Sequence, residues 1–157
     1  TNVYGKSYKV CVVDERQEIA CMNSGIAQND IGINSDVLNS YPKRQAIMSA
    51  IKTMSPDIIA VDEVAEDCEI EAIRLGVNSG VKFIVTVHAY DYDELIFRPQ
   101  IEALLNTYSF DKLILLGAQE AIGTVKAVYD TKELRDEIIR RRFNVDKSDL
   151  CGCSLFY

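Results

Sequence analysis

Two observations predict an α/β fold with a mainly parallel sheet. Four short apolar runs rich in Val and Ile lie along the chain, and helical patterns separate them. Each run is nearly continuous, which is typical of a strand covered on both faces, as in a parallel sheet. Strands that alternate with helices indicate the α/β class. The four expected strands are Lys9–Val13, Ile58–Val61, Phe83–Val87 and Leu113–Leu116.

Three helices are expected between these strands, over residues 42–54, about 66–78 and 91–105. Pro42 suits the first turn of a helix, and Gly80 suits the end of one. A proline inside the third segment predicts a break in that helix. The buried face of the first helix is expected to consist of Ala46, Ile47, Ala50, Ile51 and Met54.

The C-terminal part predicts a hairpin and a last helix. Thr124–Tyr129 is expected to pair with the fourth strand across residues 117–123. One segment interrupts the alternation, because residues 20–41 are rich in Asn, Ser, Asp and Gly. We expect a long functional or mobile loop there. The last helix, over about 132–142, is expected to bury Leu134, Ile138 and Ile139.

Length and composition favour one cytosolic domain over residues 1–157, with a motif-bearing region at about 9–130 and a C-terminal helix and tail at 131–157. Lys and Arg number 17 against 24 Asp and Glu, and this acidic balance argues against nucleic-acid binding. No apolar run reaches the roughly 18 residues of a membrane helix, so we expect no direct membrane insertion. The five scattered cysteines are typical of a reducing compartment, and Cys151-Gly-Cys153 alone is a weak indication of a metal or redox pair.

Polar residues end three of the four expected strands. Asp14 and Glu15 follow the first strand, Asp62 and Glu63 follow the second, and His88 follows the third. In open parallel sheets, ligands bind beyond the carboxyl ends of the strands. We therefore expect two acidic pairs and the single histidine of the chain to meet at one edge of the sheet.

Two acids at neighbouring strand ends suit Mg²⁺, which prefers hard oxygen ligands and keeps several waters. The segment DIIAVDE has the form of a Walker B strand. In that role, Asp62 holds the water shell of Mg²⁺, and Glu63 orients or deprotonates the attacking water. His88 is a candidate to bind the γ-phosphate of ATP, and a purely structural histidine is the alternative for that residue.

The segment Gly5-Lys6-Ser7 matches only the end of a P-loop. A working P-loop follows a strand, contains a further upstream glycine and precedes a helix. Here no glycine comes earlier, and the residues that follow, Tyr8–Val13, are strand-like. We interpret the segment as a turn that leads into a strand. The chain thus has a Walker B-like segment and no Walker A motif.

Four segments occur in an order that resembles the stage III sporulation protein AA family: VCVVDERQEIA, QNDIGINSDVLNSYPK, MSPDIIAVDE and TVHA. The resemblance covers roughly residues 5–130. It implies a RecA-like P-loop NTPase core related to the motor ATPases of secretion and pilus systems. In that family the P-loop precedes the segment that matches Lys9–Glu15. We therefore expect a core that is incomplete at its N-terminal side, the C-terminal part of a longer ATPase.

By motif, the resemblance assigns roles to further residues. The Walker B-like acids fall on the Walker B acids of the family. Asp14, Glu15 and Glu18 fall on the acidic segment of secretion ATPases, which implies a catalytic role for Glu15 and nucleotide contacts for the other two. His88 falls on their histidine segment, which also implies a nucleotide contact.

The resemblance also implies a biological setting. It implies Mg²⁺ and ATP as cofactors of the full-length protein, and a hexameric ring with nucleotide at the subunit interfaces. The implied partners are other stage III sporulation channel proteins at the membrane, and the implied location is the mother-cell cytoplasm. Without a P-loop, the chain alone is not expected to hydrolyse ATP.

Two other interpretations remain open. A receiver-like phosphoacceptor domain also has acids after its first strand, an Asp at a later strand end and a Thr beyond it, here Thr86. A non-catalytic scaffold of the same fold is the other interpretation. It rests on Asn34-Ser35-Asp36 and Val64-Ala65, where the family usually has Arg-Thr-Asp and Ile-Gly.

Overall fold

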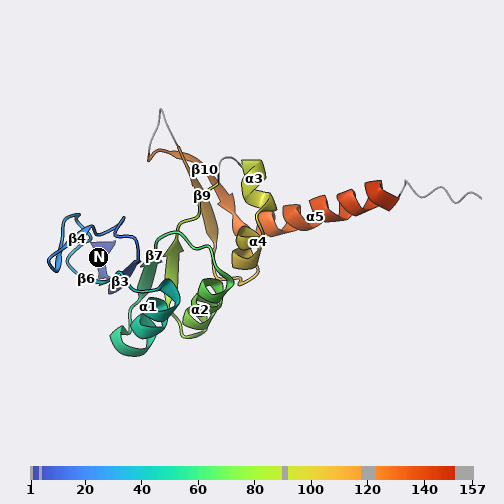
Figure 1. Cartoon of the computed structure of the whole chain (residues 1–157). Coiled ribbons are helices and arrows are strands. Elements are labelled where there is room, and N and C mark those ends of the chain that lie inside the picture. Colours follow the sequence, from blue (N-terminus) through green and yellow to red (C-terminus); the bar gives the residue numbers. More distant parts are fainter. Residues whose placement is uncertain (1, 4, 90–91, 118–122, 151–157) are drawn as a thin grey trace, which may run out of the picture. The chain divides into compact units, whose positions relative to one another are not determined.

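The computed structural model describes residues 2–3, 5–89, 92–117 and 123–150, without the side chains of residues 2–3 and 142–150. The chain divides into two compact units, residues 1–90 and 91–157. Each unit has its own sheet and helices (Figure 1). The single domain expected over the whole chain stays a prediction. The cysteine pair of the C-terminal tail, Cys151 and Cys153, lies outside the described residues.

A parallel sheet forms the centre of the first unit. Its strands are, in spatial order, β6 (Ser35–Asn39), β3 (Val10–Asp14), β7 (Ile58–Val61) and β8 (Lys82–Val85). Each neighbouring pair is parallel. The parallel sheet that the apolar runs predict is therefore confirmed, although β8 ends two residues earlier than expected.

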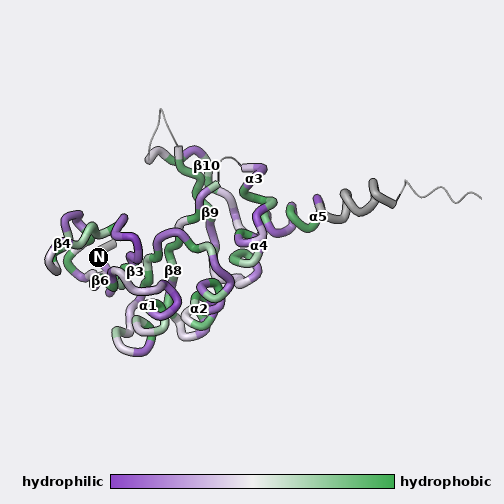
Figure 2. Tube along the Cα trace, viewed as in Figure 1, coloured by the Kyte–Doolittle hydropathy of each residue, from purple (hydrophilic) through white to green (hydrophobic). Residues whose placement is uncertain are grey.

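The central strand β3 explains why these runs are continuous. Cys11, Val12 and Val13 are each at most 4% exposed, so both faces of this strand are buried. In the register of the sheet, Val13 lies between Leu38 of β6 and Val61 of β7. Figure 2 shows hydrophobic stretches in the strands and also along parts of the helices.

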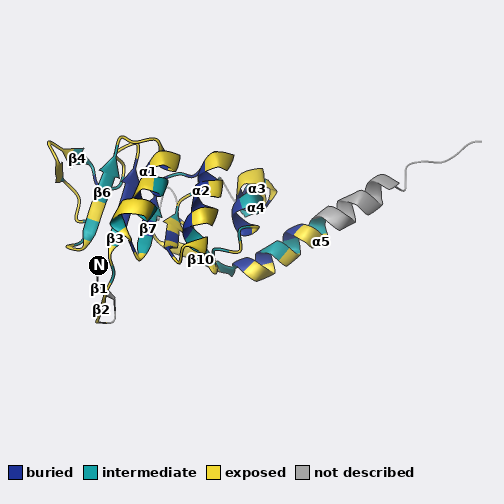
Figure 3. Ribbon diagram, turned by 90° about the horizontal axis from the view of Figure 1, so that it is seen from below, coloured by how far each residue is buried: buried dark blue, intermediate teal, exposed yellow. Residues whose placement is uncertain are grey.

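Helices α1 (Lys43–Ser49) and α2 (Asp67–Asn78) pack beside each other on this sheet (Figure 1, Figure 3). A short π-helix, η1 (Ala50–Met54), continues α1 and ends at Ser55, whose φ of 47° is left-handed. Pro42 is the N-cap residue of α1, one position before the first turn in which the sequence places it, and it makes no side-chain cap hydrogen bond. The expected apolar face is buried at three positions, Ala46, Ile47 and Ala50.

Gly76 allows α2 to approach strand β8. A Cβ at this position would lie 2.5 Å from the ring of Phe83 and 3.0 Å from Ile51. The ring of Phe83 therefore fills the space that any larger residue at position 76 would need. This glycine is a packing requirement and not a helix end.

The prediction of a long loop over residues 20–41 is wrong in part. It contains a small hairpin, β4 (Met22–Asn23) with β5 (Ile26–Ala27), and then the edge strand β6. The β6 sequence SDVLN is polar and half-buried, because an edge strand needs no continuous apolar run. Periodicity therefore gave no signal for it.

The N-terminal segment forms a short hairpin. The turn expected over Gly5-Lys6-Ser7 is found only at Gly5, because Lys6 and Ser7 belong to a strand. Strand β1 (Asn2–Val3) pairs antiparallel with β2 (Lys6–Ser7). Gly5 has a φ of 76°, a conformation that favours glycine. The element that directly follows Ser7 is strand β3 and not a helix.

The second unit contains α3 (Tyr92–Phe97), α4 (Pro99–Leu105), β9 (Lys112–Leu116), β10 (Val125–Asp130) and α5 (Thr131–Leu150). Helix α3 ends before Arg98 and α4 begins at Pro99, which confirms the expected break. Strands β9 and β10 form the expected hairpin, but they are a sheet of their own. The prediction that 113–116 belongs to the parallel sheet is wrong.

Helix α5 corrects one core prediction. Leu134 and Ile138 are buried at spacing i, i+4, whereas Ile139 is 51% exposed because it lies one position off this face. Tyr92 stacks on Tyr129 and donates a hydrogen bond of 2.7 Å to Glu137. Burial and this bond raise the pKa of Tyr92 to about 12. No helix in the described ranges is long and apolar enough to cross a membrane.

Candidate functional site

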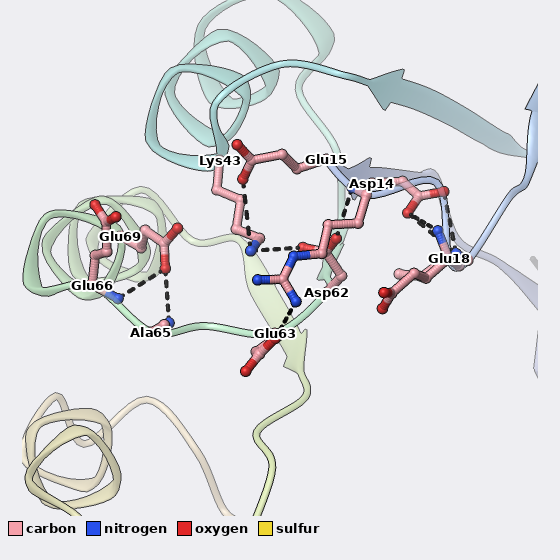
Figure 4. Close-up of polar contacts among 11 residues, drawn as sticks. Asp14, Glu15, Glu18, Lys43, Asp62, Glu63, Ala65, Glu66 and Glu69 are labelled. Carbon is pink, nitrogen blue, oxygen red and sulfur yellow. Dashed lines mark hydrogen bonds and ion pairs between the residues drawn. The ribbon is translucent and has the colours of Figure 1, made fainter.

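The carboxyl ends of β3 and β7 bring the four expected acids together. The two strands are parallel neighbours, and the amide of Asp62 donates to the carbonyl of Val13 at 3.3 Å. Asp14 and Glu15 end or follow β3, and Asp62 and Glu63 follow β7 (Figure 4). The expected meeting of two acidic pairs at one edge of the sheet is what the structure shows.

Asp14 is fully buried, and its carboxylate organises the turn that follows β3. It accepts hydrogen bonds from the backbone amides of Glu18 at 2.8 Å, Ile19 at 3.2 Å and Ala20 at 2.8 Å. Both oxygens are therefore used within this turn. Glu18 contributes its amide, while its side chain is exposed. The nucleotide contacts expected of these two residues stay predictions.

Asp62 is the buried acid at the centre of the site. It is 3% exposed, and its Oδ2 accepts a hydrogen bond of 3.3 Å from the amide of Arg16. Its Oδ1 lies 3.2 Å from the ammonium of Lys43. This pair is close but is not aligned as a hydrogen bond, and Oδ1 has no hydrogen-bond donor among the described residues.

Lys43 is a functional candidate that the sequence reasoning missed. It is the first residue of α1, is 5% exposed, and also lies 3.6 Å from Glu15, which is 40% exposed. A cation at a helix N-terminus opposes the helix dipole, which costs about 0.3–1 kcal/mol at exposed positions. The ion pair offsets this cost. Loss of one partner of such a buried pair costs about 3–5 kcal/mol, because it leaves an uncompensated buried charge.

Glu63 is less buried than Asp62 and pairs with a different cation. Its side chain is 24% exposed, and its Oε2 lies 2.6 Å from Nη1 of Arg16. Arg16 thus contacts both acids that follow β7, Asp62 through its backbone and Glu63 through its guanidinium. Because Arg16 is 57% exposed, solvent screens this pair.

The structure does not join His88 to this group of acids. His88 is exposed and lies three residues beyond the end of β8. None of the contacts described for residues 5–89 connects it to Asp62 or Glu63. Its expected role as a nucleotide contact stays a prediction.

Glu69, another buried acid, belongs to a helix cap instead. Its Oε2 accepts hydrogen bonds from the amides of Ala65 at 2.9 Å and Glu66 at 3.1 Å, at the start of α2 (Figure 4). This is the side chain of a capping box reaching back to the helix start. The cap fixes the segment that leads away from Glu63.

The carboxylate oxygens of this site fit a Mg²⁺ ion that keeps most of its waters. They do not fit an ion that is bound entirely by protein ligands. Within the described ranges, no three His, Cys, Asp or Glu side chains are grouped to hold a metal. Mg²⁺ in phosphoryl-transfer sites is usually bound by one or two carboxylates together with waters and phosphate oxygens. The buried Oδ1 of Asp62, without a hydrogen-bond donor, is a hard oxygen of this kind.

Comparison with solved structures supports the fold. The X-ray structure of the Legionella pneumophila ATPase DotB superposes with a TM-score of 0.52 at 15% identity, over 85% of this chain and 40% of that chain. At this identity the likeness shows the fold alone. The central parallel sheet, its flanking helices and this neighbour are consistent with a RecA-like P-loop core.

Comparison of sequences identifies the family. The chain is 35% identical to Stage III sporulation protein AA of Bacillus subtilis (strain 168) over 122 residues, which is 78% of this chain and 40% of that protein. It is 27% identical to the uncharacterized protein ycf45 of Porphyra purpurea over 128 residues, 79% of this chain and 22% of that protein. The chain therefore spans less than half the length of these relatives. The profile of the family Sporulation stage III, protein AA matches residues 1–135, and the chain belongs to this family.

Proposed function

We propose that this chain carries the Walker B half of an ATP-hydrolysing motor that energises a secretion-like channel in sporulation. The observation that carries the proposal is the buried Asp62, whose Oδ1 has no hydrogen-bond donor in the described part of the chain, next to the more accessible Glu63. In this proposal, one acid holds a cation and the other meets water. These are the two tasks that phosphoryl transfer requires of the protein at this point.

In this proposal the residues of the site have separate tasks. Asp62 holds the water shell of Mg²⁺, and the ion neutralises charge on the phosphates when it is bound. Once Arg16 releases the Glu63 carboxylate, Glu63 orients the attacking water and accepts a proton from it. Glu15 supports this chemistry as the second acid, and His88 contacts the γ-phosphate.

The phosphate clamp is proposed to lie in a segment that precedes this chain in a longer protein. Without backbone amides and a lysine to hold the β- and γ-phosphates, Asp62 and Glu63 have no positioned substrate. We therefore propose that the chain alone is inactive. The longer protein acts as a hexameric ring with other stage III sporulation channel proteins, in the mother-cell cytoplasm beside the membrane.

Two measurements test this proposal. The reading frame upstream of Thr1 is expected to encode a GxxxxGK[ST] motif after an apolar run. The purified 157-residue chain is expected to show no Mg²⁺-dependent ATP turnover above buffer, while the longer product does. Robust turnover by the chain alone, abolished by Glu63→Gln, would refute the missing-clamp argument. An upstream frame without the motif would refute the enzyme proposal itself.

The strand order of the sheet keeps a receiver-like phosphoacceptor as a second candidate. When the strands of the first unit's parallel sheet are numbered by their order in the chain, their spatial order is 2-1-3-4. This is also the strand order at the start of flavodoxin-like sheets. The phosphoacceptor would be Asp62. Its 3% exposure and its ion pair with Lys43 argue against ready attack on a phosphodonor. Incubation with acetyl phosphate and Mg²⁺, followed by mass spectrometry of Asp62, distinguishes the two candidates.

A further inference from the structure

We propose that Lys43 is a built-in counter-cation, which occupies the divalent-cation position beside Asp62 until Mg²⁺ displaces it. The inference rests on the proposed function only for the identity of the ion and of Asp62 as its carboxylate. It assigns Lys43 a positioning role and Glu15 the role of its alternative partner.

The burial and the contacts of the pair are the first argument. Lys43 and Asp62 are 5% and 3% exposed, so neither charge is screened effectively by solvent. The ammonium lies 3.2 Å from Oδ1, the oxygen that lacks a hydrogen-bond donor among the described residues. A cation is thus already present at the atom that the metal would need. Figure 4 shows the Lys43 side chain reaching from the start of its helix towards Asp62.

The geometry also provides a place for Lys43 to move to. Its ammonium lies 3.6 Å from Glu15, whose side chain is 40% exposed and therefore closer to solvent than Asp62. Lysine has a flexible stem and a compact charge, so it can exchange partners without movement of the helix. A shift from Asp62 towards Glu15 keeps one ion pair and frees Oδ1.

Charge repulsion prevents the ammonium of Lys43 and a Mg²⁺ ion from occupying the position beside Asp62 at the same time. Two cations within about 4 Å repel each other by several kcal/mol at the effective dielectric of a protein surface. The buried carboxylate therefore has one cation at a time, either the ammonium or the metal. In both states Asp62 stays neutralised, and this allows the sheet edge to remain folded before any nucleotide arrives.

The test uses thermal unfolding of the 157-residue chain without nucleotide, in EDTA and in Mg²⁺. Lys43→Met keeps the stem and removes the charge. Its Tm in EDTA is expected to be about 10 °C below that of the unmodified chain, because Asp62 is left unpaired. Mg²⁺ at about ten times its Kd for Lys43→Met is expected to raise the Tm of this variant by about 4 °C. The unmodified chain is expected to change by less than about 1 °C, because Lys43 already holds the position.

Two further variants separate the proposal from a general loss of stability. Lys52→Met makes the same chemical change at an exposed position and is expected to leave both Tm values unchanged. The double variant Lys43→Met/Asp62→Asn removes both charges of the pair. It is expected to recover most of the lost Tm and to lose the response to Mg²⁺.

Titration calorimetry adds a direct readout of the competition. Lys43→Met is expected to bind Mg²⁺ about tenfold or more tightly than the unmodified chain, because the competing ammonium is gone. If Lys43→Met does not fold in EDTA, folding of the double variant without a Mg²⁺ response still supports the proposal.

Three results would overturn it. These are an unchanged Tm for Lys43→Met in EDTA, a lowered Tm that neither Mg²⁺ nor Asp62→Asn restores, and equal Mg²⁺ affinity with and without the lysine. Since no nucleotide is used, these outcomes are independent of ATP turnover. An absence of ATPase activity therefore does not affect the outcome of this test.

Discussion

The turn after β3 is held by one buried carboxylate, and Asp14→Asn tests how strongly. The fully buried Asp14 accepts short hydrogen bonds of 2.8 Å from the amides of Glu18 and Ala20, with Ile19 at 3.2 Å between them. Asparagine has the same shape, but one of its two terminal atoms is a donor. Whichever way the amide is oriented, a backbone N–H then faces an NH₂ group.

The magnitude follows from these contacts. A hydrogen bond to a charged group contributes about 1.5–3 kcal/mol net, and an unsatisfied buried donor costs about 1–3 kcal/mol. Asp14→Asn loses one short charge-assisted bond and weakens the others, because the negative charge is gone. We expect the free energy of unfolding to fall by about 3 kcal/mol.

Urea unfolding followed by far-UV circular dichroism measures this loss. With a slope of about 2 kcal/mol per M, the midpoint is expected to fall by about 1.5 M. Asp30→Asn is the matched control, because Asp30 is exposed and, among the described residues, accepts one hydrogen bond, from the amide of Gly32 at 3.0 Å. Its effect is expected to stay within about 0.5 kcal/mol. Equal effects of the two substitutions would refute the conclusion that Asp14 holds the turn.

Two further predictions concern the core of the first unit. Gly76→Ala is expected to lower the Tm by about 5 °C, because its Cβ would lie 2.5 Å from the ring of Phe83. Adding Phe83→Leu to Gly76→Ala should recover part of this loss. A Gly76→Ala single variant with the Tm of the unmodified chain would contradict the packing argument. Burial raises the pKa of the Cys11 thiol from 9.0 to about 11, so its contribution to stability is full below pH 9.0 and is lost as the pH rises towards 11. Urea midpoints across this range should decline less steeply for Cys11→Ala, and parallel declines would contradict this.

The parallel sheet was predictable because its buried strands need continuous apolar sequence. Cys11, Val12 and Val13 are buried on both faces, and the sequence shows this directly. The edge strand β6 carried no such signal, since its pairing with β3 is made by the backbone and its side chains are only half-buried. The hairpin strand β9 had the right pattern but a different partner, because periodicity does not report which strand lies beside which.

The candidate site was predictable where the chemistry lies at strand ends. Asp62 and Glu63 follow an apolar run, so their place at the sheet edge could be inferred from sequence alone. Lys43 and Arg16 could not, because their roles depend on contacts with residues 19 and 47 positions away in the chain. The only hint of Lys43 was a cation at the start of a helix, where it opposes the dipole. The hydrogen bonds of Asp14 to its own turn were equally invisible.

The most direct test of the central claim is the rate of Mg²⁺-dependent ATP hydrolysis by the longer protein with Glu63→Gln. Loss of a general base that acts on water is expected to lower kcat by about 10²–10⁴-fold. Glu71→Gln, at an exposed acid of α2 that pairs with Arg74, is the control and should retain the full rate. A Glu63→Gln protein that hydrolyses ATP as fast as the control would contradict the assignment of Asp62 and Glu63 as the Walker B acids.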